Sequence, residues 1–150
     1  DQNALLDRED GWISGISGSL SQQADKYSLD IAFTYLKGDV VYDGQTQGGL
    51  PHKTYTNEQI IDGSISLGIL NAVSLIRPSS VYFGFGFREW QRDILPTGAV
   101  LGLFETYYWH YGFIGGKVEL LRKDKLSVWL DGRLTRPINP TMEICFSNFD

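Results

Sequence analysis

Residues 80–93 read SVYFGFGFREWQRD, and this stretch decides how the rest of the chain is interpreted. Val81, Phe83, Phe85 and Phe87 occupy alternate positions, and Gly84, Gly86, Arg88 and Arg92 lie on the opposite parity. Successive side chains of a β-strand point to opposite faces. A strand here has one aromatic face and one face of bare backbone and guanidinium. The interpretation of the chain depends on which face meets the core of the protein and what the other face meets.

The same alternation recurs along most of the sequence. Apolar residues alternate with small or polar ones in four further segments, 11–22, 26–37, 60–70 and 125–136. A repeat of 180° per residue is typical of strands, and we find neither helical periodicity nor an internal repeat. Together with residues 106–121, these segments predict an all-β fold with six strands. Residues 141–147 are a candidate seventh strand.

Residues 99–121 are harder to interpret, because apolar side chains occupy both parities around Tyr107–Phe113. We interpret residues 106–121 as the strand and the residues before it as a loop. Two shorter strands joined at residues 110–112 are the alternative. The pattern alone does not fix which face each side chain occupies.

Bulk properties exclude several classes of protein. A length of 150 residues predicts one domain, residues 1–150, and the net charge of −5 gives no reason to expect a nucleic-acid partner. The single cysteine, Cys145, cannot form an internal disulfide. No apolar stretch approaches the 18 residues of a transmembrane helix, and Asp1 is interpreted as a mature or trimmed end.

The predicted connections alternate between short and long. Residues 22–26, 71–80 and 122–125 are short or modest in length, whereas residues 42–59 and 93–105 are long, glycine-rich and polar. In an antiparallel meander this alternation places all long loops at one end of the sheet and all short turns at the other.

The face opposite the apolar one indicates what surrounds the strands. A soluble sandwich covers its water-facing side with lysine, glutamate and threonine; here that side is mostly Gly, Ser and Ala, which suit the inside of a narrow barrel. An Arg facing lipid at mid-membrane costs about 2–4 kcal/mol, so Arg88 is expected to point inward. The charges on the small-residue face are balanced and predict a structural network filling the lumen, formed by Asp30, Asp62, Arg88, Arg92, Asp131 and Arg133.

Aromatic residues at strand ends support a membrane setting. Tyr27 and Tyr35 lie near the two ends of one strand, and further aromatic residues cluster at 107–111. Tyr and Trp form girdles at both edges of bacterial outer-membrane barrels. We therefore predict an antiparallel up-and-down transmembrane β-barrel of about eight strands, with Phe83, Phe85 and Phe87 facing the acyl chains.

Three segments carry a resemblance to a known group of proteins. They are YDGQTQGG at 42–49, FGFGFREWQRDILPTGAVLGLFETYYWHYG at 83–112, and RLTRPINP at 133–140. The combination resembles the small outer-membrane β-barrel proteins of Gram-negative bacteria, and more narrowly an uncharacterised family of such barrels. The resemblance covers roughly residues 27–144 and implies a location in the bacterial outer membrane; its motifs have no catalytic content.

Closure of the barrel leaves alternatives open. If the long loops are extracellular, the first strand runs toward the periplasm, whereas such barrels normally have both ends in the periplasm and an even strand count. The chain is then a piece of a larger barrel, or a strand lies within residues 1–10, or a partner chain completes the closure. Unpaired edges in lipid cost several kcal/mol per group, so something must cover them.

Candidate chemistry is sparse. We interpret His52 as a solvated residue of the long polar loop, and His110 as a hydrogen-bonding residue of the girdle or lumen. His110 with Glu105 or Asp93 imitates a base and its orienting carboxylate, but no serine lies at a recognisable spacing. We predict neither a cofactor nor a metal site, since the aspartates of residues 39–43 lack the spacing of a calcium loop.

These observations predict a non-enzymatic outer-membrane barrel. Its partners are expected to be outer-membrane lipid and either a chain that closes the barrel or one bound by the long loops, which would supply surface structure or partner binding. The alternatives are a soluble β-barrel carrier whose apolar face lines a ligand pocket, and an outer-membrane enzyme with its site at the rim.

Overall fold

The structure, a computed structural model, describes residues 7–45, 48–71, 79–124 and 126–146. It is all-β and antiparallel, as the alternation predicted. The strands are β1 (Arg8–Gly11), β2 (Ser14–Ala24), β3 (Tyr27–Gln45), β4 (Pro51–Leu70), β5 (Ser79–Ile94), β6 (Leu103–Lys123) and β7 (Leu126–Phe146). Within the described residues, no helix is long and apolar enough to cross a membrane.

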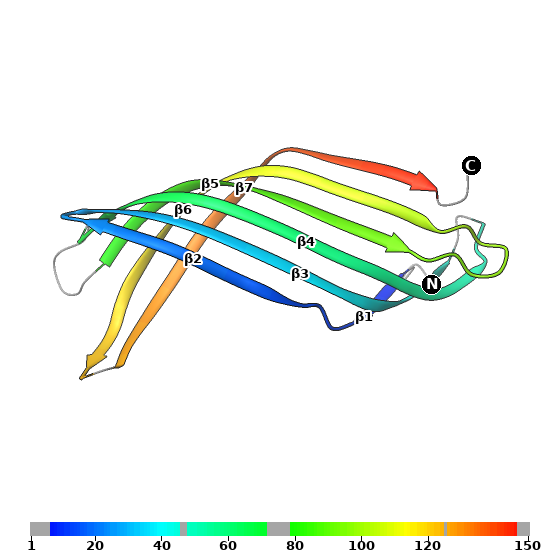
Figure 1. Ribbon diagram of the computed structural model, residues 1–150, viewed down its shortest axis with the longest axis horizontal. Coiled ribbons are helices and arrows are strands. Elements are labelled where there is room, and N and C mark those ends of the chain that lie inside the picture. Colours follow the sequence, from blue (N-terminus) through cyan, green and yellow to red (C-terminus); the bar gives the residue numbers. More distant parts are fainter. Residues whose placement is uncertain (1–6, 46–47, 72–78, 125, 147–150) are drawn as a thin grey trace, which may run out of the picture.

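All seven strands belong to one sheet, in which β3, β4, β5, β6 and β7 pair in chain order. β1 and β2 both pair with β3 and continue one another, because Gly11 lies opposite Val40 and Ser14 opposite Lys37 in the same register. The sheet arches along its length, and the β6–β7 hairpin bends away at its turn (Figure 1). β1–β2 and β7 are its two edges, and the sheet is not closed into a barrel.

A tight turn joins β2 to β3 at one end of the sheet, the turn end, and β4, β5, β6 and β7 are connected in pairs at the same end. Asp25, between β2 and β3, and Asp124, after β6, adopt positive φ angles of 50° and 48°. Aspartate tolerates this left-handed conformation, which two-residue hairpins require for their twist to match that of the strands. The connections between β3 and β4 and between β5 and β6 lie at the opposite end, the loop end.

The observed strands are longer than predicted, and the long loop expected at 42–59 is wrong. β3 runs to Gln45 and β4 starts at Pro51, so most of this polar segment is a hairpin. Likewise β6 is one strand from Leu103, which excludes the alternative of two strands joined at 110–112. β7 continues through residues 136–146, so the candidate seventh strand is the end of β7.

The two faces of the sheet differ in how side chains meet. On one face, Tyr111 of β6 donates to Asp62 of β4 at 2.8 Å, across β5. Tyr82 of β5 donates to Asp131 of β7 at 2.6 Å, across β6. Adjacent strands lie about 4.7–4.9 Å apart, so contacts that skip a strand form on the side toward which a sheet curves. We call this side the inner face and the opposite side the outer face.

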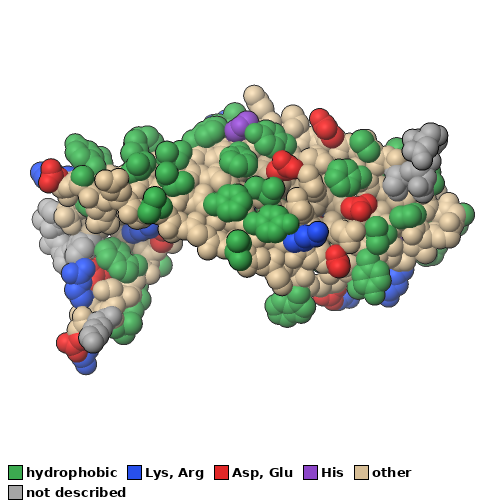
Figure 2. Space-filling view, viewed as in Figure 1, with side chains coloured by type: hydrophobic (Ala, Val, Ile, Leu, Met, Phe, Trp, Pro, Cys, Tyr) green, Lys and Arg blue, Asp and Glu red, His purple; other side chains and the backbone are tan. Residues whose placement is uncertain are grey.

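Phe83, Phe85 and Phe87 lie on the outer face, with 61%, 47% and 38% of their surfaces exposed. Arg88 lies on the inner face, because it pairs in register with Asp62. Exposed hydrophobic side chains are visible across the surface in Figure 2, with acidic side chains among them mainly in the half nearer the C-terminus. The curved sheet therefore has its polar side inside and its apolar side outside.

Candidate functional site: the inner face

The middle of the inner face holds a half-buried ion pair. Arg88 Nε donates to Asp62 Oδ2 at 2.7 Å, and the Tyr111 hydroxyl donates to Asp62 Oδ1 at 2.8 Å. The Arg88 guanidinium also lies 5.8 Å from the centre of the Trp109 ring. Both oxygens of the carboxylate are thereby satisfied, and β4, β5 and β6 are joined through side chains as well as backbone.

Nearer the loop end, one arginine binds three glutamates. Arg92 donates from Nε to Glu58 at 3.1 Å, from Nη1 to Glu105 at 2.6 Å, and from Nη2 to Glu9 of β1. Glu58 is only 2% exposed, and it also accepts a bond from the Trp90 indole. Each nitrogen of the guanidinium therefore has an acidic partner from a different strand.

Electrostatics reinforce this Arg92 cluster. Burial alone would lower the pKa of the Arg92 guanidinium, but the bonds to and charges of Glu9, Glu58 and Glu105 raise its pKa above the ordinary value. Burial also raises the pKa of the nearby Tyr42 hydroxyl, and the charge of Glu9 adds to this effect. Arg92 is thus a permanent cation, and removing it would leave buried carboxylates without their counter-ion.

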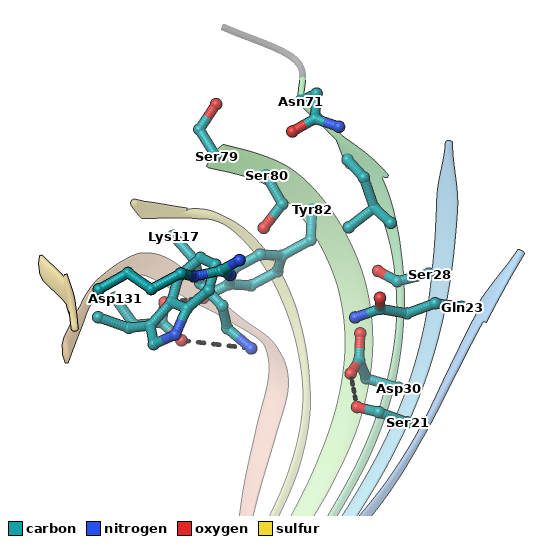
Figure 3. A pocket seen from close by; sticks show the side chains of 13 residues that line it. Ser21, Gln23, Ser28, Asp30, Asn71, Ser79, Ser80, Tyr82, Lys117 and Asp131 are labelled. Carbon is teal, nitrogen blue, oxygen red and sulfur yellow. Dashed lines mark hydrogen bonds and ion pairs between the residues drawn. The ribbon is translucent and has the colours of Figure 1, made fainter. Parts of the chain in front are cut away.

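Toward the turn end the inner face is hollowed. Figure 3 shows the side chains around a cavity of about 540 Å³. Asp131 accepts a bond from Tyr82 at 2.6 Å and lies 3.7 Å from the Lys117 ammonium. Asp30, on β3, accepts a bond from Ser21. Acids and bases line the cavity together, so it has no clear preference for one sign of ligand charge.

The six residues predicted as a lumen network all lie on the inner face, but they do not form a single network. Only Asp62 and Arg88 pair with each other. Among the described residues Arg133 has no ion pair; its guanidinium lies 5.1 Å from the centre of the Phe113 ring. Arg92, Asp131 and Asp30 bind partners outside the predicted set: Glu9, Glu58, Glu105, Lys117, Tyr82 and Ser21.

A signal for the missed glutamates exists in the register. Glu58 and Glu105 lie directly opposite Arg92 on the two neighbouring strands. Opposite charges on facing positions stabilise a sheet. Because the segment containing Glu58 was interpreted as loop, it had no register, and this facing arrangement could not be recognised.

Glycines on the inner face make room for aromatic rings. A Cβ atom at Gly84 would lie 2.3 Å from the Phe113 ring, and one at Gly86 would lie 2.4 Å from the Tyr111 ring. These distances are far below van der Waals contact, so only glycine fits beneath the rings. The small residues of the SVYFGFGF stretch therefore serve the packing of the inner face.

The outer face divides into two regions along the strands. Near the turn end is the apolar band, made of Ile16, Leu20, Tyr27, Leu29, Ile31, Phe33, Tyr35, Ile61, Ile65, Leu67, Ile69, Val81, Phe83, Phe85, Phe87, Ile114, Val118, Leu126, Val128, Leu130 and Leu134. Toward the loop end the same face becomes the polar extension, made of Lys37, Asp39, Asn57, Gln59, Glu89, Gln91 and Asp93.

The two histidines lie apart from each other and from any predicted carboxylate partner. His110 is on the outer face, where it bonds the Tyr108 hydroxyl at 2.9 Å and stacks on Phe85. Glu105 is on the inner face, and Asp93 bonds Asn57 instead. His110 thus lies at the border of the apolar band, bonded to a tyrosine, and the geometry brings it together with neither acid.

The prediction that His52 is a solvated loop residue is wrong. It belongs to β4, is 7% exposed and packs against the Tyr42 ring, with 5.8 Å between ring centres. Among the described residues, its Nε2 atom has no hydrogen-bond partner. The error has the same origin as the missed glutamates, namely the extension of β3 and β4 beyond the alternating segment.

The fold and inner face define an antiparallel β-sheet protein with a curved, charge-paired inner side and an apolar outer side. In the described parts of the chain, no group of three His, Cys, Asp or Glu side chains is arranged to hold a metal ion. Comparisons with protein-family models, with curated proteins and with solved structures find no match to this sequence.

Proposed function

We propose that this protein is a non-enzymatic transmembrane β-barrel of the bacterial outer membrane, with a lumen filled by its own side chains. The apolar band is the observation that supports this proposal. On β3 it spans nine residues, from Tyr27 to Tyr35, and on β4 nine residues, from Ile61 to Ile69. A tilted strand needs about 9–11 residues to cross a bilayer.

The inner face supports the same proposal. Its charges are paired across strands, and aromatic rings fill the space above its glycines. Small barrels are filled by their own side chains, so we expect no open channel. The polar extension then projects beyond the membrane, where it provides surface structure or binds a partner.

The open edges are part of the proposal. In hydrocarbon each unpaired backbone group costs several kcal/mol, so β1–β2 and β7 must be covered in a membrane. Further strands or a partner chain would supply this cover. Outer-membrane lipid is the second partner, in contact with the apolar band.

The alternatives fit the geometry less well. A soluble carrier needs its apolar face lining an enclosed pocket, whereas here the inner face is the polar one. A rim-site enzyme needs His110 beside a carboxylate, whereas Glu105 lies on the other face. We therefore favour the membrane barrel over both.

Cysteine labelling in vesicles tests the proposal. In a Cys145→Ser background, Phe85→Cys places a thiol in the apolar band, and Gln91→Cys places one in the polar extension of the same strand and face. After reconstitution we expect a water-soluble maleimide to label Gln91→Cys rapidly and Phe85→Cys very slowly. Both should react equally in urea, which controls for intrinsic reactivity.

Equal labelling of the two folded variants would contradict the proposal. So would recovery of the wild-type protein as a monomer in aqueous buffer after membranes are pelleted. Either result would favour the soluble carrier over the membrane barrel.

A further inference from the structure

The outer face has a groove between β6 and β7, with a cavity of about 300 Å³. Its lining includes Gly112, Ile114, Leu134, Arg136 and Ile138. A Cβ atom at Gly112 would meet no atom within 4 Å, so the floor of the groove is open. The walls are aliphatic, and the groove therefore suits a hydrocarbon chain.

Arg136 is an unusual member of this lining. It lies opposite Gly112 in the register, one alternation from Leu134 of the apolar band. Within the described part of the chain it has no ion pair. Facing lipid, an arginine costs about 2–4 kcal/mol at mid-membrane and less near an interface.

The border of the apolar band is close to Arg136. His110 and Tyr108, bonded to each other at 2.9 Å, follow Gly112 along the outer face of β6 toward the loop end. An arginine side chain is long enough to place its charge at such a border while its methylene groups lie on apolar surface. Glu89, the acid at this border on β5, lies opposite Tyr108 and accepts a bond from Gln91.

We propose that the groove over Gly112 binds one anionic lipid, with an acyl chain between Ile114, Leu134 and Ile138 and its phosphate at the Arg136 guanidinium. A lipid supplies in one molecule the anion that Arg136 lacks and the chain that fills the groove. Guanidinium binds phosphate through paired, charge-assisted hydrogen bonds. This inference rests on the proposed membrane location, because only there is the outer face in contact with lipid.

Retention of lipid by the folded protein tests the inference. The protein is reconstituted in nanodiscs of phosphatidylcholine and phosphatidylglycerol in equal amounts, and the lipids that it keeps on release are counted by native mass spectrometry. We expect the wild type to favour phosphatidylglycerol about fivefold, the effect of one basic residue near a bilayer surface. Arg136→Gln should abolish the preference. Lys53→Gln, which removes a positive charge remote from the groove, should leave it unchanged.

A second variant separates the chain from the headgroup. Gly112→Leu fills the floor of the groove, where the structure has open space, and leaves Arg136 in place. We expect it to retain less lipid of both kinds. A wild-type preference that persists in both Arg136→Gln and Gly112→Leu would overturn the inference.

Three further outcomes are distinct. If inorganic phosphate competes fully with phosphatidylglycerol, the site binds a free anion and the acyl-chain part is wrong. If the wild-type protein fails to insert into nanodiscs of any composition, the proposed function itself fails. Insertion of all variants with equal lipid retention would refute only the lipid site.

Discussion

The apolar band and the polar extension are made by the same strands in the same register, yet the outer face changes from almost wholly apolar to mainly polar. On β5, Phe83, Phe85 and Phe87 give way to Glu89, Gln91 and Asp93 without any change in pairing. Backbone geometry therefore does not explain the switch. Under the proposed function a change of surroundings explains it, because the outer face of one continuous strand meets hydrocarbon in the apolar band and water in the polar extension.

The inner faces of the two regions differ as well. Beneath the apolar band the inner face has serines, glycines and a cavity. Beneath the polar extension it is tightly packed, with Thr56 fully buried and Glu58 2% exposed. The strands beneath the polar extension thus have a small packed core, built around the Arg92 cluster on the inner face. This end of the sheet is therefore not a set of loops.

The largest expected effect concerns this core. Arg92→Leu leaves Glu58 and Glu105 buried without their cation, and we expect a loss of about 3–5 kcal/mol in the free energy of unfolding. Arg8→Leu, which breaks an exposed pair with Asp10, should change stability by about 0.5 kcal/mol or less. Urea unfolding in detergent, followed by tryptophan fluorescence, measures both, and similar losses would show that the extension has no core.

The second prediction would break the comparison directly. Phe85→Arg places a charge in the apolar band, and we expect it to cost about 2–4 kcal/mol when folding occurs in vesicles. Gln91→Arg, three alternations along the same outer face, should be nearly neutral. Folded fractions as a function of urea in lipid vesicles measure the difference. Equal stability of the two variants would mean that the apolar band and the polar extension have the same surroundings.

The third prediction concerns the half-buried pair below the apolar band. Arg88→Leu removes one partner of Asp62, which keeps its bond from Tyr111. We expect a loss of about 1–3 kcal/mol, the cost of a buried acceptor deprived of one partner. Lys53→Leu breaks only an exposed contact of 3.6 Å with Asp43 and should have little effect. Matching thermal shifts would count against a paired inner face.

The smallest effect sharpens the contrast between faces. Gly86→Ala puts a methyl group against the Tyr111 ring, whereas Gly112→Ala enters open space on the outer face. Overpacking opposes the usual gain from replacing glycine in a strand, so we expect a net loss of about 1 kcal/mol for Gly86→Ala. Gly112→Ala should be neutral or slightly stabilising. Urea unfolding of the two variants in detergent measures the difference. If Gly86→Ala were the more stable of the two, the Tyr111 ring would have moved aside.

Much of the fold could be predicted from alternation alone. The facing of Phe83, Phe85 and Phe87 opposite to Arg88 follows from parity, and parity survives small errors in strand ends. The Asp62–Arg88 pair was among the predicted residues because both lie in alternating segments. Where one face is apolar and the other is not, the alternation predicts both that a strand is present and which face each side chain occupies.

In the Arg92 cluster only Arg92 itself was predicted, and its three glutamate partners were not, for a physical reason. In residues 51–59 most side chains on both faces are polar, because the outer face holds lysine, asparagine and glutamine and the inner face holds glutamate, threonine and histidine. No alternation survives there, and the segment resembles a loop. Pro137 and Pro140 lie within β7, an edge strand, where proline is tolerated because one side of the strand is unpaired.

The directions of the two free edges restrict what can lie between them. β2 runs toward the turn end and β7 runs away from it, so the edges are already antiparallel to each other. One additional strand would run parallel to one of its neighbours, whereas a pair of strands keeps every contact antiparallel. Under the proposed function, an element that covers both edges is therefore expected to be a hairpin, whose side chains alternate between the hydrocarbon side and the ion-paired inner side.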